Sequence, residues 1–147
     1  MKKVLVLYYS RTGNTEKMAN AIAQSIQASS NIEVELNFHV APESLSSYDA
    51  LIVGAPTYHH DMPADFKNLF EDVAVKGVNL KGKLAVAFGS FGWSGEAPKM
   101  ILEILKNKFE MQVLEPPLLV RYTPDQNSLN ACKELGIKVS ETLKNLS

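Results

Sequence analysis

Short apolar runs alternate along this chain with longer segments in which apolar residues recur at helical spacing. Residues 4–9 form the first run, which is apolar on both faces, as in a parallel strand covered on both sides. Four further strands are predicted at residues 32–38, 50–53, 84–88 and 118–120, and helices begin near Thr15, Phe66, Ile101 and Leu129. This order predicts an α/β fold: a three-layer, doubly wound, five-stranded parallel sheet with helices on both faces. Residues 32–38 alternate strictly between apolar and polar, which indicates an edge strand.

Length and composition narrow the class of protein further. The 147 residues are 46% hydrophobic and 21% charged, which excludes a disordered chain and a coiled coil. Since no repeat or linker interrupts the chain, we expect residues 1–147 to form a single domain. A net charge of -1 provides no basic excess for nucleic acid, so we expect none as a partner. The apolar run at the N-terminus is too short for a secretory signal, and no run approaches the roughly 18 residues of a membrane span, so we expect a cytoplasmic protein without membrane contact.

The first loop carries chemistry that suits an anion. In open α/β sheets, ligands bind at the carboxyl ends of the strands, so the loops after the first, third and fourth strands are the candidates. Residues 10–15 read S-R-T-G-N-T between a buried strand and a helix. Backbone N–H groups at a helix N-terminus and nearby hydroxyls bind phosphate, and Gly13 permits a close approach. The alternative is that Thr12 or Thr15 simply caps the helix.

This loop resembles the phosphate loop of the flavodoxin-like family, written T/S-x-T-G-x-T, and every defined position matches. The resemblance extends over nearly the whole chain. Residues 54–60 look like the family's first isoalloxazine loop, and residues 89–97 are similar to a segment in the flavodoxin module of A-type diiron flavoproteins. The resemblance implies strand order 2-1-3-4-5, FMN as the cofactor, and a free-standing version of that flavin module.

The expected FMN site follows from these three loops. A flat redox ring needs aromatic walls, and Tyr58 and Trp93 each follow a buried strand, so we expect them to flank the ring. For Trp93, ordinary core packing is the alternative. No catalytic side chain and no metal site are expected. The expected cofactor-binding residues are Ser10, Arg11, Thr12, Gly13, Asn14, Thr15, Pro56, Thr57, Tyr58, His59, His60, Ser90, Phe91, Gly92, Trp93, Ser94 and Gly95.

Three other features of the sequence resemble functional sites or reactive groups but are interpreted differently. Residues 77–83 fit the first part of a nucleotide P-loop, but Leu84 replaces the Ser/Thr that would contact magnesium, and the segment precedes a strand. His59, His60 and Asp61 look like a metal cluster, yet adjacent histidines on one loop rarely converge on one ion. A role of His59 or His60 at the flavin edge is the favoured interpretation. Cys132 is in phase with apolar helix positions and is expected to be a core residue.

The leading functional hypothesis is a flavodoxin-like electron carrier that shuttles electrons between redox protein partners. The alternative is an FMN-dependent NAD(P)H:quinone oxidoreductase, and a third is an interaction domain that lacks flavin. The donor, the acceptor and the oligomeric state stay open. The second loop also lacks glycine between Thr57 and Asp61. If that loop requires a positive φ, a bulky residue must adopt it, at a strain of about 1–3 kcal/mol.

Overall fold

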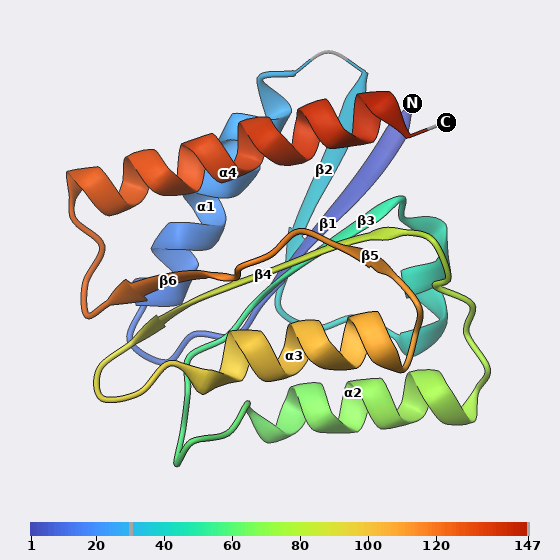
Figure 1. Cartoon of the computed structure of the whole chain (residues 1–147), viewed down its shortest axis with the longest axis horizontal. Helices are drawn as coiled ribbons and strands as arrows, with labels where there is room; N and C mark the ends of the chain where they lie inside the picture. Colours follow the sequence, from blue (N-terminus) through green and yellow to red (C-terminus); the bar gives the residue numbers. More distant parts are fainter. Residues whose placement is uncertain (30, 147) are drawn as a thin grey trace.

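The protein, described here from a computed structural model that covers residues 1–29 and 31–146, is built around a parallel sheet (Figure 1). The strand order is β2-β1-β3-β4-β5, and β6 also pairs with β4, so the expected order is confirmed and β2 lies at the edge. All pairs are parallel. The strands are β1 (Lys2–Tyr8), β2 (Ile32–Asn37), β3 (Ala50–Gly54), β4 (Leu84–Phe91), β5 (Gln112–Val113) and β6 (Leu118–Arg121).

The number of strands differs from the prediction. The fifth position of the sheet holds two short strands, β5 and β6, so the sheet is six-stranded. β5 pairs with the start of β4, and β6 pairs with its end. Pro116 and Pro117 lie between them, and proline has no N–H group to donate to the neighbouring strand. Residues 115–117 therefore leave the ladder, and β5, with two residues, is too short to be recognised in the sequence.

Two helices cover each face of the sheet (Figure 1). Alternate residues of β1 divide between the two cores: Val4 and Val6 pack under α1 and α4, whereas Leu5 and Leu7 pack under α2 and α3. This division is the two-residue period of a strand buried on both sides. The helices are α1 (Asn14–Gln27), α2 (Ala64–Val75), α3 (Glu96–Asn107) and α4 (Gln126–Asn145), and a short 3-10 helix, η1 (Pro42–Ser47), precedes β3.

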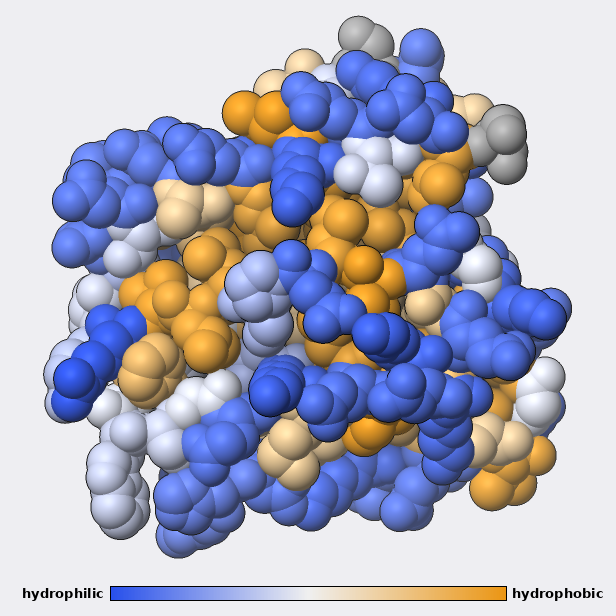
Figure 2. Space-filling view, viewed as in Figure 1, coloured by the Kyte–Doolittle hydropathy of each residue, from blue (hydrophilic) through white to orange (hydrophobic). Residues whose placement is uncertain are grey.

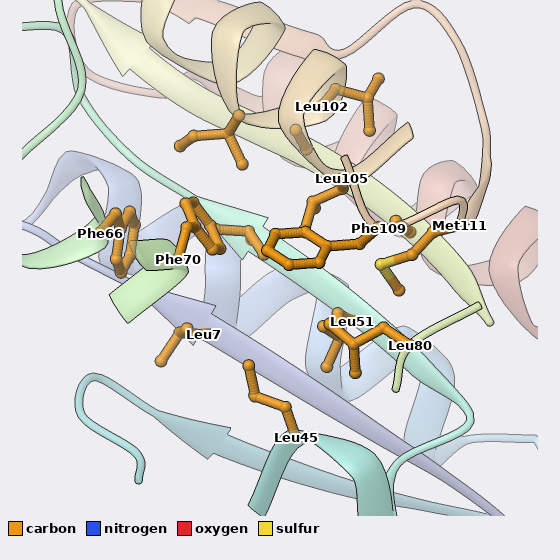
Figure 3. Close-up of a cluster of buried hydrophobic side chains, with 14 of the residues drawn as sticks. Leu7, Leu45, Leu51, Phe66, Phe70, Leu80, Leu102, Leu105, Phe109 and Met111 are labelled. Carbon is orange, nitrogen blue, oxygen red and sulfur yellow. The ribbon is translucent and has the colours of Figure 1, made fainter. Parts of the chain in front are cut away.

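The core under α2 and α3 is rich in aromatic side chains. Phe70 lies between Phe66 and Phe109, with ring centroids 6.3 and 6.4 Å away (Figure 3). Leucines from β1, β3 and η1 close this cluster from the sheet side. On the other face, Cys132 is fully buried, and burial raises the pKa of its thiol to about 11, so its expected role as a core residue is confirmed.

The outer surface is mostly polar. Figure 2 shows polar side chains over the outside of α4 and a band of apolar side chains between α4 and the β5–β6 segment. Leu114, Leu118 and Leu129 are partly buried and pack against the core under α1 and α4. Residues 77–83, which resemble part of a P-loop, lie between α2 and β4, at the end of the sheet opposite the carboxyl ends of the strands. None of the helices described is long and apolar enough to cross a membrane.

Candidate functional site

A cavity of about 600 Å³ opens at the carboxyl ends of β1, β3, β4 and β6. Eleven of the seventeen sequence-predicted site residues line this cavity, together with Tyr122, so the three loops converge on one place. A larger groove of about 720 Å³ lies between α3 and residues 115–119, but Gly95 is the only predicted site residue in it. The lining residues of the first cavity are Ser10, Arg11, Thr12, Asn14, Thr15, Pro56, Thr57, Tyr58, Ser90, Phe91, Gly92 and Tyr122.

The first loop wraps the N-terminus of α1. Gly13 precedes the helix with φ 88°, a left-handed conformation that glycine adopts at little cost. Ser10 Oγ accepts hydrogen bonds from the N–H groups of Gly13 and Glu16, at 3.1 and 3.4 Å. Neither Thr12 nor Thr15 provides a side-chain cap, so the capping alternative is wrong for both. Their hydroxyls line the cavity at a helix end whose dipole attracts negative charge.

Thr15 also ties the first loop to β4. Its side chain is 1% exposed, and its Oγ1 accepts a hydrogen bond from the Ser90 N–H at 3.3 Å. This bond joins residues 75 positions apart in the sequence. The hydroxyl hydrogen of Thr15 stays available for a ligand oxygen, because accepting from Ser90 does not use it.

The second loop makes a tight two-residue turn. Tyr58 and Asp61 exchange two backbone hydrogen bonds, at 2.8 and 2.9 Å, around His59 and His60. Both histidines have positive φ, 49° and 63°. The loop therefore does place bulky residues in the left-handed conformation, which the sequence alone did not establish. Such a turn favours Asn-Gly, and a bulky residue there is strained. Neither histidine lines the cavity.

Replacing His59 by glycine is expected to raise the free energy of unfolding by about 0.5–1 kcal/mol, because the relief of the left-handed strain exceeds the extra entropy of an unfolded glycine. Urea unfolding of the protein measures it. His39→Gly is the matched control, because His39 is also exposed but is not among the positive-φ residues, and this change should lower stability. A loss of stability in His59→Gly would contradict the strain argument.

The second and third loops brace one another at the start of α3. Thr57 Oγ1 accepts a hydrogen bond from the Ala97 N–H at 2.9 Å. His60 Nδ1 lies 2.5 Å from Glu96 Oε2, and hydrogen bonds from Ser94 and then His60 hold the pKa of the Glu96 carboxyl below its usual value. Asp61 forms an ion pair with Lys67 on α2. These contacts fix the outer wall of the cavity.

Trp93 lies outside the cavity. Its side chain is 89% exposed, and its ring centroid is 5.7 Å from that of His60. The alternative that Trp93 packs in the core is therefore wrong. The Trp93 ring does not line the cavity either. Gly13, Ser94 and Gly95 likewise lie beside the cavity without lining it. The aromatic lining comes instead from Tyr58, Phe91 and Tyr122.

Tyr122 is the lining residue that the sequence analysis missed. It directly follows β6, has φ 60°, and is fixed on both sides: its N–H donates to the Phe91 carbonyl at 2.7 Å, and its carbonyl accepts from Ser90 Oγ at 2.8 Å. An aromatic residue at the carboxyl end of the last strand was the available signal. The three loops expected to bind follow the first, third and fourth strands, and Tyr122 lies after the last strand.

Comparison with known proteins decides the family. The family model described as "Flavodoxin" matches residues 6–136, most of the chain. The chain belongs to the flavodoxin family. Flavodoxins bind FMN, so membership confirms the expected cofactor, and it does not favour the quinone oxidoreductase alternative.

Its flavodoxin relatives include proteins of similar length and longer ones. The flavodoxin of Clostridium beijerinckii is 32% identical over 138 residues, covering 92% of this chain and 97% of that protein. A solved flavodoxin from the domain Archaea has a TM-score of 0.88 at 35% identity, covering 97% and 99% of the two chains. A putative diflavin flavoprotein A 5 of Nostoc sp. (strain PCC 7120) is 34% identical over 149 residues, covering 96% of this chain. The chain spans about a quarter of that longer relative.

Proposed function

We propose that the cavity at the carboxyl ends of the strands holds FMN, and that the loaded protein carries electrons between redox proteins. One observation carries this proposal: hydroxyl groups at the N-terminus of α1 and aromatic rings from three other loops line one cavity of about 600 Å³. A cofactor with a terminal phosphate and a flat ring needs that combination. The volume also lies within the usual range for small-molecule sites.

In this proposal each part of the cavity has its own role. Ser10, Thr12, Asn14 and Thr15 bind the phosphate, with the dipole of α1 favouring its charge. Tyr58 and Phe91 provide aromatic walls, and the short connections between Thr57, Ala97, His60 and Glu96 keep the walls in place. When bound, FMN supplies reversible electron transfer. The protein's residues orient it and limit the access of water.

The other expected residues keep supporting roles in this proposal. Gly13 shapes the phosphate loop, and Ser94 and Gly95 position the start of α3. Trp93, His59 and His60 lie at the rim, where they can contact a ring that projects beyond the cavity. We further propose that residues 1–147 form one domain and that it acts in the cytoplasm. The near-complete coverage of the Clostridium beijerinckii flavodoxin supports the domain part of this proposal.

The test separates a carrier from an enzyme with its own substrate. The FMN-loaded protein is reduced with dithionite and mixed with cytochrome c as a one-electron acceptor, and separately mixed with NAD(P)H and menadione. A carrier reduces cytochrome c rapidly and does not sustain NAD(P)H oxidation. Sustained turnover of NAD(P)H with menadione by the purified protein would overturn the carrier proposal in favour of the oxidoreductase.

A further inference from the structure

A cavity of about 540 Å³ opens at the amino ends of the strands, at the edge of the sheet opposite the candidate FMN site. Lys2 begins β1, Asp49 directly precedes β3, and Lys83 directly precedes β4. Leu143 and Leu146 line the cavity from the C-terminal end of α4, so the two ends of the chain meet there (Figure 1). None of the residues that line this cavity belongs to the expected cofactor-binding set.

Basic side chains outnumber acidic ones around this cavity. Three lysines, Lys2, Lys81 and Lys83, line it together with one carboxylate, that of Asp49. The whole protein has a net charge of -1, and the groove of about 720 Å³ beside α3 is lined by two lysines and two glutamates. The excess of positive charge is therefore a property of this cavity and not of the surface as a whole.

The carboxylates near these lysines neutralise little of their charge. Asp49 Oδ2 accepts a hydrogen bond from the Lys3 backbone N–H at 2.8 Å, so a neutral donor holds it in place and it offsets one of the three positive charges. Glu110 lies 3.8 Å from Lys81 Nζ, and the two side chains are 65% and 72% exposed. An exposed pair at that separation contributes little, so Lys81 is only weakly neutralised.

The other two lysines have no counterion. Among the residues that the structure describes, neither Lys2 nor Lys83 forms an ion pair. Lys83 Nζ donates to the neutral Tyr48 carbonyl at 2.6 Å, which orients the lysine and leaves two of its three N–H groups unused by this bond. The C-terminal end of α4 adds about half a negative charge through its dipole, which is less than the charge of these two lysines.

Residues 77–83, which resemble part of a P-loop, contribute side chains to this cavity and no free backbone cradle. The three N–H groups of residues 81–83 all donate within the protein, at 3.0 to 3.2 Å, whereas a P-loop uses such groups to hold phosphates. Asn79 accepts one of them through Oδ1, so its side-chain amide keeps two hydrogens to donate. Any anion here is therefore held by lysine and amide side chains.

We propose that this cavity, which we call the amino-edge site, binds a small multivalent anion that carries neighbouring phosphate groups, either a free oligophosphate or a nucleotide. Lys2, Lys81 and Lys83 supply the positive charge, and Asn79 supplies neutral donors. Because an ammonium group is a compact charge on a flexible stem, the site selects its ligand by charge density more than by shape. The site goes beyond the proposed function, since the sheet separates it from the candidate FMN site.

An NMR titration with tripolyphosphate at low salt tests the amino-edge site. The protein is labelled with ¹⁵N and loaded with FMN, so that the candidate phosphate loop is already filled. The amide signals of residues 81–83 should shift, and those of residues 10–15 should not. Binding should weaken as salt is added, and orthophosphate should bind at least about tenfold more weakly because it carries less charge. Absent shifts at residues 81–83, or equal binding of orthophosphate, would overturn the proposal.

A second titration with ATP distinguishes the two sources of the phosphate groups. An affinity equal to that of tripolyphosphate assigns the site to the phosphate chain alone. An affinity at least about tenfold tighter, with shifts at Leu143 and Leu146, assigns it to a nucleotide whose apolar part contacts these side chains. Failure of both probes to bind would overturn the site itself.

The double variant Lys2→Gln/Lys81→Gln should weaken the binding of tripolyphosphate about three- to tenfold, because it removes two of the three positive charges. Lys83 is left in place, since its bond to the Tyr48 carbonyl also supports the fold. The variant Lys2→Arg/Lys81→Arg keeps the charge and should bind nearly as the wild type does. A loss of binding in the arginine variant equal to that in the glutamine variant would contradict recognition by charge.

The double variant Lys17→Gln/Lys99→Gln is the matched control. It removes the same charge from the fourth residue of α1 and of α3, two helices that begin at the carboxyl ends of the strands. Both lysines are exposed, and neither forms an ion pair within the described residues. This variant should bind tripolyphosphate nearly as the wild type does. Equal losses in the two glutamine variants would overturn the site, because they would show attraction to overall charge only.

The same samples separate this proposal from the proposed function. FMN occupancy is read from the visible absorbance of each protein before titration. A protein that carries FMN and shows no shift with tripolyphosphate overturns the amino-edge site alone. A protein that takes up no FMN overturns the proposed function, and the signals of residues 81–83 still decide the amino-edge site, because residues 10–15 report separately on the other cavity.

Discussion

An FMN affinity at least about a hundredfold weaker is expected when Thr12 and Thr15 are both replaced by alanine. Both hydroxyls line the cavity beside the N-terminus of α1, and neither is used to cap the helix. A hydrogen bond to a charged group contributes about 1.5–3 kcal/mol, and each 1.4 kcal/mol is a tenfold change in affinity. Titration of the apoprotein with FMN, followed by quenching of flavin fluorescence, measures the change.

Two controls keep this result interpretable. Thr15→Ser retains the hydroxyl that accepts from the Ser90 N–H, so it should bind FMN nearly as the wild type does. Thr142→Ala removes a hydroxyl that donates to the Lys138 carbonyl within α4, and it should have no effect on FMN. Wild-type affinity in a folded Thr12→Ala/Thr15→Ala variant would show that the phosphate binds elsewhere.

Gly89→Ala is expected to lower the free energy of unfolding by about 3 kcal/mol or more. A Cβ atom at Gly89 would lie 2.0 Å from the Ala55 carbonyl oxygen and 2.9 Å from Pro98 Cγ. The Ala55 backbone cannot yield easily, because its N–H donates to the Phe88 carbonyl at 3.0 Å. Overpacking of a core commonly costs about 1–3 kcal/mol, and here the clash is with backbone. Urea unfolding measures the loss.

Gly92→Ala is the matched control, three positions along the same segment. A Cβ there would meet Tyr122 at 3.6 Å, which is an ordinary contact. Its stability should therefore fall much less. Gly89→Ala should also weaken FMN binding, because Ser90 and Phe91 directly follow the displaced residue and line the cavity. Equal stability of the two variants would mean that β3 and β4 separate more easily than their contacts indicate.

The strands that were predicted correctly are those whose burial on one or both faces can be read from a single run of consecutive residues. β1, β3 and β4 are apolar on both faces because helices cover both sides of the sheet, and this is visible in a single run of residues. β2 alternates because it lies at the edge. β5 was missed because two residues carry no periodicity, and its place beside β4 depends on tertiary contact alone.

In the candidate site, too, the residues that could be predicted are those that a local sequence pattern identifies. The first loop, residues 10–15, could be recognised because the family pattern that it matches consists of particular residues in sequence order. Tyr122 could not be found in this way, since its place beside the cavity depends on a positive φ and on hydrogen bonds to Ser90 and Phe91, which lie more than 30 residues away. The glycines around Trp93 indicated an exposed loop correctly, but they carry no information on which way the ring points.

Selectivity among flavins tests the central claim most directly, because the claim is that this cavity recognises FMN through its phosphate. The apoprotein is titrated calorimetrically with FMN, with riboflavin, which lacks the phosphate, and with FAD, whose phosphate is not terminal. The structure predicts one FMN per chain, with riboflavin bound at least about a hundredfold more weakly and FAD also disfavoured. Riboflavin binding as tightly as FMN, or no FMN binding at all, would contradict the account.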